Sequence, residues 1–72
     1  MQLSVTTRLL ELTQEFNNQF KIAAIYALGE GGHPTLSVTT RLLDLTRDQS
    51  NDVKEAAIRA LGRINRPSAP KA

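Results

Sequence analysis

The stretch LSVTTRLLELT, residues 3–13, returns almost unchanged 33 residues later as LSVTTRLLDLT, residues 36–46. The same offset relates Pro34 to Pro67. A fixed period between about 20 and 50 residues is typical of repeat proteins, in which each unit buries its apolar side against its neighbour. The duplication therefore predicts a stack of two similar units.

Each unit contains two segments with helical spacing of apolar residues. In the first segment, Val5, Leu9 and Leu12 fall at i, i+4 and i+7, which places them on one helix face. The second segment pairs FKIAAIYALG, residues 20–29, with VKEAAIRALG, residues 53–62, and seven of the ten positions are identical. Its alanines allow another helix to approach closely, and Phe20 belongs to the same apolar stripe. We expect an all-α protein with helices at about residues 4–14, 18–30, 35–47 and 51–64.

Residue types that begin and end helices lie between these segments. Asn17 and Ser50 are good N-caps, and the short turns around them predict antiparallel hairpins. Pro34 suits the first position of a helix, where its missing N–H costs nothing. Gly32 and Asn65 are the residue types that most readily adopt the left-handed conformation at a helix end.

The second segments resemble HEAT-like repeats of the short type also found in phycobilisome (bilin) lyase proteins. The residues that carry this resemblance are VKEAAIRALGRI, residues 53–64, and the copy that begins at Phe20. The resemblance spans residues 3–68 and implies an α-solenoid fragment of two HEAT-like hairpins. We expect one domain over residues 1–66, with repeat one at 3–35 and repeat two at 36–66, followed by a disordered tail at 67–72.

The chain departs from the family pattern at a few core positions. Gly31 stands where repeat two has the apolar Ile64, so the helix end at Gly31 is expected either to fray early or to be filled by another group. Thr13 and Thr46 stand where the family commonly has leucine. These departures predict a thin core.

Composition limits the class of protein. Seventy-two residues make one small domain, and the absence of cysteine together with a single histidine excludes a disulfide framework and a thiolate metal site. No signal peptide or membrane-spanning run is present, so a cytoplasmic protein is expected. The net charge of +2 is uneven: residues 3–35 carry −1 and residues 36–68 carry +2.

Two repeats are fewer than the roughly three that such stacks usually need. The open ends therefore predict that the chain is a fragment, self-associates, or docks on a larger protein, and docking is favoured. The resemblance implies a concave binding face formed by the second helices. Its outward positions correspond to Asn18, Gln19, Ile22, Ala23, Tyr26 and Glu30 in repeat one and to Asn51, Asp52, Glu55, Ala56, Arg59 and Arg63 in repeat two.

The differences between the copies suggest roles on this face. Ile22 and Tyr26 are interpreted either as hydrophobic anchors for a partner or as surface apolar residues that cover a thin core. Glu55 and Arg59 are interpreted either as an exposed i, i+4 ion pair or, with Arg63, as polar groups that orient a partner.

The function expected from these features is that of a non-enzymatic adaptor or assembly factor that docks on a larger protein. Three alternatives stay open: an accessory factor of a phycobilisome or photosynthetic complex, a structural homo-oligomer that stacks through its open ends, and nucleic-acid binding through Arg59, Arg63 and Arg66. The last lacks interleaved aromatic residues for stacking, and cations near a helix C-terminus are favourable without any ligand.

Signals for catalysis are weak. His33 follows Glu30 closely, but no nucleophile or second ligand accompanies this pair, and no cofactor or metal is expected. Gly29 and Gly62 are interpreted as sites of close helix packing, not as parts of a nucleotide-binding loop.

Overall fold

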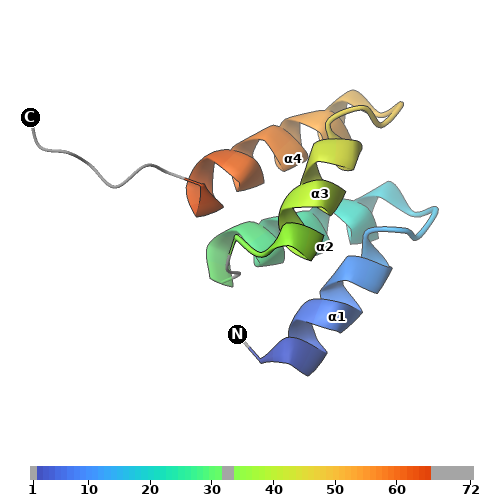
Figure 1. Cartoon of the computed structure of the whole chain (residues 1–72). Helices are drawn as coiled ribbons and strands as arrows, with labels where there is room; N and C mark the ends of the chain where they lie inside the picture. Colours follow the sequence, from blue (N-terminus) through green and yellow to red (C-terminus); the bar gives the residue numbers. More distant parts are fainter. Residues whose placement is uncertain (1, 32–33, 66–72) are drawn as a thin grey trace, which may run out of the picture.

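A computed structural model describes residues 2–31 and 34–65 of the chain. The described residues form four helices (Figure 1), which are α1 Leu3–Leu12, α2 Asn18–Gly31, α3 Leu36–Leu45 and α4 Asn51–Ile64. The predictions made for Gly32, His33, Arg66 and the tail at 67–72 lie outside the described residues. The all-α architecture is confirmed. Among the described helices, none combines the length and the apolar character that crossing a membrane requires.

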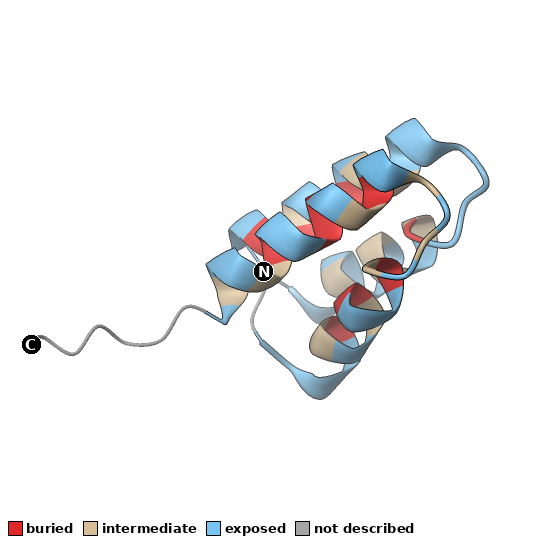
Figure 2. Ribbon diagram, turned by 90° about the horizontal axis from the view of Figure 1, so that it is seen from above, coloured by how far each residue is buried: buried red, intermediate tan, exposed pale blue. Residues whose placement is uncertain are grey.

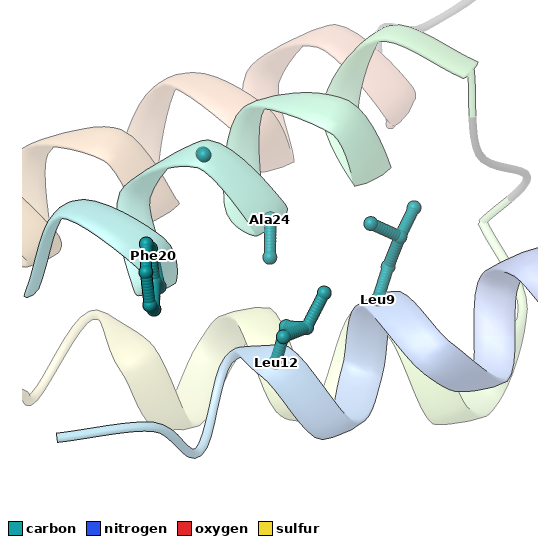
Figure 3. A pocket seen from close by; sticks show the side chains of 5 residues that line it. Leu9, Leu12, Phe20 and Ala24 are labelled. Carbon is teal, nitrogen blue, oxygen red and sulfur yellow. The ribbon is translucent and has the colours of Figure 1, made fainter. Parts of the chain in front are cut away.

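The helices form two layers. Helices α2 and α4 lie side by side and run in the same direction, while α1 and α3 form the other layer (Figures 1 and 3). Within each repeat the first helix packs against the second, and the most extensive contact in the molecule is between α2 and α4. The junction between the repeats is therefore made chiefly by their second helices.

Both predicted N-caps are confirmed. The Asn17 side-chain oxygen accepts hydrogen bonds from the backbone N–H groups of Gln19 and Phe20, at 2.8 and 3.1 Å. The Ser50 hydroxyl accepts one from the Val53 N–H at 3.3 Å. These bonds satisfy amides that have no partner inside the helix, so α2 and α4 begin where the caps place them.

Helices α1 and α3 end two residues earlier than predicted. At the end of α1 the Thr13 hydroxyl donates to the Leu10 carbonyl at 2.6 Å, and at the end of α3 the Thr46 hydroxyl donates to the Leu43 carbonyl at 2.6 Å. A threonine that bonds the preceding turn offers the backbone an alternative to further helical bonds. The two threonines thus close their helices in the same way.

Three other predictions about helix ends need correction. Pro34 does not occupy the first helical position of α3, because Thr35 is the N-cap and its hydroxyl accepts from the Val38 N–H at 3.3 Å. Asn65 closes α4 with φ at −108°, which is outside the left-handed region. Helix α2 continues through Gly31, so it does not fray early.

Burial differs sharply between the two repeats although their first helices are almost identical. Val5 in α1 is 45% exposed, whereas its counterpart Val38 in α3 is 0% exposed. Helix α1 has no buried residue, and Phe20 of the predicted apolar stripe is exposed. The apolar core (Figure 2) consists of Ile25, Leu28, Val38, Leu42, Leu45, Val53, Ala56, Ala57 and Ala60. Repeat two thus supplies most of the residues of the core.

The two glycines expected at close helix contacts behave differently. A Cβ atom placed on Gly29 would lie 2.9 Å from both Cα and Cβ of Ala60, so the close approach of α2 and α4 requires glycine there. Around Gly62, the described residues outside its own stretch of helix place no atom within 4 Å of such a Cβ. The prediction is confirmed for Gly29 and wrong for Gly62 within a single chain.

Polar contacts also join the repeats. Thr13 is fully buried and accepts a hydrogen bond from Arg41 Nε at 2.9 Å, and the Thr13 carbonyl accepts a second one from the same guanidinium at 3.0 Å. A mostly buried ion pair joins Lys21 and Asp48 at 3.1 Å. Thr13 therefore does more than thin the core, because it holds α3 against the end of α1.

Candidate functional site

The predicted binding residues that face one another across α2 and α4 form a charged surface. Glu30 on α2 accepts a hydrogen bond from Arg63 on α4 at 3.0 Å, which joins residues 33 positions apart. Along α4, Glu55 and Arg59 form the i, i+4 ion pair expected from their spacing, at 2.9 Å. Both pairs are exposed, so each contributes little to stability in water. Acidic and basic side chains therefore alternate across this surface.

Tyr26 lies on the same surface. It is 42% exposed, and it occupies in α2 the position that Arg59 has in the neighbouring α4. The pKa of Arg59 is raised, first by its hydrogen bonds to Glu55, then by the charge of Glu55, and then by Tyr26. Ile22, one turn before Tyr26, is half-buried and packs against the core. Tyr26 is thus an accessible aromatic side chain beside paired charges.

The remaining predicted residues do not join this surface as one patch. Asn18, Gln19, Asn51 and Asp52 are exposed at the first turns of α2 and α4. Asn18 lines a polar cavity of about 570 Å³ between the two interhelical turns, together with Lys21, Asp48 and other residues. Ala56, expected to point outward, is 0% exposed because it packs in the core at the repeat junction.

Ala23, the counterpart of Ala56, belongs to a separate apolar groove that sequence reasoning missed. The groove encloses about 250 Å³ between α1 and α2 (Figure 3), and it is lined by Leu9, Leu12, Phe20, Ala23 and Ala24. Leu9 and Leu12 point from α1 toward α2, and Phe20 and Ala24 face them. The repeat pattern contained a signal for this groove, because a terminal repeat in a stack of two has no neighbour to cover one of its sides.

Phe16 is a second feature that the sequence did not single out. It lies in the turn between α1 and α2 and is fully exposed. Exposed aromatic residues are enriched where proteins bind other proteins, although a single one needs no explanation.

The described surface of α2 and α4 carries an exposed aromatic side chain and two ion pairs. Among residues 2–31 and 34–65, no three His, Cys, Asp or Glu side chains are placed to hold a metal ion. Glu55 and Glu30 are engaged by Arg59 and Arg63. This surface therefore presents an aromatic ring, two carboxylates and two guanidinium groups.

Comparison with known proteins places the chain in one family. The family described as HEAT repeats matches residues 6–72. No curated protein and no solved structure matches the chain.

Proposed function

This chain belongs to the family of HEAT repeats, and on that premise we propose that it is a non-enzymatic adaptor that binds a larger protein. The binding surface in this proposal is the one formed by α2 and α4. HEAT repeats commonly serve as protein-interaction scaffolds, which supports this class of function.

The accessible ring of Tyr26 is the observation that carries the proposal. Tyr26 is exposed on α2, and its counterpart on the adjacent α4 is Arg59. Arg59 is paired with Glu55, which occupies the position that Ile22 has in repeat one. Tyrosine and arginine are among the residue types most enriched at binding hot spots. A partner that buries the ring and places a carboxylate near Arg59 would use both groups.

The paired charges favour a protein partner over nucleic acid. Arg59 and Arg63 both donate to carboxylates, from Glu55 and Glu30. Binding to a phosphate backbone gains affinity from cations that neutralise phosphates, and the two carboxylates on this surface would repel phosphate. Absence of a salt-dependent mobility shift with DNA or RNA at low ionic strength is the expected result.

A narrower proposal concerns the partner. The resemblance of residues 53–64 to the short repeats of bilin lyases makes a component of a photosynthetic antenna complex the first candidate. Immobilised chain exposed to purified phycobilisome proteins tests this, and failure to retain any of them rejects the narrower proposal alone.

The adaptor proposal is tested by comparing the unmodified chain with Tyr26→Ala and Arg59→Glu in affinity capture from the native cell followed by mass spectrometry. Truncating a hot-spot tyrosine costs about 2 kcal/mol or more, which is a roughly 30-fold loss of affinity. A partner should therefore be retained by the unmodified chain and lost with both variants. Thr40→Ala, at an exposed position of α3, is the matched control.

Circular dichroism confirms that each variant is folded before capture. Equal retention of every protein by the folded Tyr26→Ala and Arg59→Glu variants would show that the α2 and α4 surface is not the binding surface.

A further inference from the structure

The apolar groove between α1 and α2 has a covered counterpart in repeat two. Shifted by 33 positions, its five lining residues become Leu42, Leu45, Val53, Ala56 and Ala57. All five of these are buried, and they share one core cluster with Ile25 and Leu28 of α2. Repeat one thus covers this surface of repeat two, whereas the equivalent surface of repeat one stays open.

The opposite end of the molecule carries the matching surface. Ile25 and Leu28 of α2 correspond to Ile58 and Leu61 of α4. Ile25 is fully buried, whereas Ile58 is 60% exposed and Leu61 is half-buried. Gly29, which admits Ala60 at the junction, corresponds to Gly62, where the surrounding space is open. Helix α4 therefore presents the side chains that fill such a groove.

The ion pairs of the junction also have counterparts at the two ends. Lys21 and Asp48, joined at 3.1 Å, correspond to Lys54 at the α4 end and Glu15 at the α1 end. Glu30 and Arg63, joined at 3.0 Å, correspond to Arg63 at the α4 end and Glu30 at the α1 end. Both pairs of counterparts have opposite charges. Arg63 and Glu30 already pair within each copy, so Lys54 and Glu15 carry the new attraction between the ends.

The residues that form the hydrogen bonds between Arg41 and Thr13 also have counterparts at the two ends of the molecule. Arg41 donates to Thr13 at the junction. Their counterparts are Arg8 at the α1 end and Thr46 at the α4 end, and the Thr46 hydroxyl bonds its own preceding turn at 2.6 Å as that of Thr13 does.

We propose that the chain stacks head to tail with a second copy of itself, with α4 of one copy covering the groove between α1 and α2 of the next. The occupant is a second copy because apolar, ionic and hydrogen-bonding counterparts all match at one offset. This inference goes beyond the adaptor function, since it uses the repeat ends. A head-to-tail interface leaves one end of each kind free, so further copies add until the assembly closes or extends.

Two variants that each block one end test the proposal. Gly62→Leu fills the open space on α4, and Ala23→Arg obstructs the groove at an exposed position. Multi-angle light scattering over a wide concentration range should show the mean mass of the unmodified chain rising with concentration. Each variant alone should stay at the 7.9 kDa of one chain.

An equimolar mixture of the two variants should double the mean mass and go no further, because only one compatible pair of ends remains. Thr40→Leu, on the side of α3 opposite its buried residues, should associate like the unmodified chain. Circular dichroism establishes that each variant is folded. An unmodified chain that stays monomeric, or a mixture that does not pair, would overturn the proposal.

A charge exchange tests the junction contacts themselves. Lys54→Glu should weaken the association, because it faces Glu15 of the second copy, and adding Glu15→Lys to the same chain should restore it. Restoration is expected only if these two positions meet, so failure of the double variant to recover the mass of the unmodified chain rejects this arrangement. Neither test depends on capture of a partner by Tyr26, so the two proposals fail separately.

Discussion

Gly29 and Gly62 occupy the same position in their repeats, yet substitution with alanine is expected to stabilise the chain only at Gly62. In a helix interior, alanine is favoured over glycine by about 1 kcal/mol, and this gain applies to both sites. At Gly29 the new methyl group would lie 2.9 Å from Cα and Cβ of Ala60, so the helices must separate. Such overpacking costs about 1–3 kcal/mol.

The helix-propensity gain cancels when the two variants are compared, which leaves the contact with Ala60 as the difference. We expect Gly62→Ala to stabilise the chain by about 1 kcal/mol. Gly29→Ala should lie about 1–3 kcal/mol below it in free energy of unfolding. For a domain of this size, each 1 kcal/mol corresponds to a shift in Tm of roughly 4–8 °C.

Urea and thermal unfolding followed by circular dichroism measure both variants beside the unmodified chain. A low protein concentration keeps association from adding to the stability of the unmodified chain. If Gly29→Ala and Gly62→Ala are stabilised equally, α2 and α4 do not approach as closely as described, and the account of the repeat junction is wrong.

Two further predictions concern the polar links between the repeats. Thr13→Val keeps the shape but removes the hydroxyl that accepts from Arg41, so it should lower the free energy of unfolding by about 1–3 kcal/mol in denaturant titrations; no loss would show that the buried hydroxyl is dispensable. The pKa of Asp48 is lowered below 3.8, first by the hydrogen bond from the Ser50 N–H and, against the opposing effect of burial, by the hydrogen bond and charge of Lys21. Ionised Asp48 therefore stabilises the fold above its unfolded pKa, and this stabilisation is lost as the pH falls through the lowered folded pKa. Asp48→Asn should be less stable than the unmodified chain at neutral pH and approach it below about pH 4, and a difference independent of pH would refute the assignment.

The helices and the N-caps could be predicted from the sequence because local spacing and local hydrogen bonds decide them. Asn17 and Ser50 bond amides only two or three residues away. Burial could not be predicted in the same way. Val5 and Val38 stand in identical surroundings in the sequence, and only the neighbouring repeat makes one exposed and the other buried. Position within the stack determines that difference.

The candidate site was predictable where it follows the spacing within one helix, and not where it depends on how the two repeats pack. The pairing of Glu55 with Arg59 follows from helical spacing, and this prediction is confirmed. The bond between Glu30 and Arg63 requires α2 and α4 to lie side by side in register, which local patterns do not specify. The roles of Tyr26 and Ile22 in binding stay predictions.

The buried bond between Thr13 and Arg41 gives the stack a polarity. The hydroxyl that accepts belongs to the earlier repeat, and the guanidinium that donates belongs to the later one. Two molecules that met through like ends would place Arg8 against Arg8 or Thr46 against Thr46, and neither pairing reproduces this bond. An open assembly of such units would therefore have two distinguishable ends, one presenting α4 and the other presenting the groove between α1 and α2.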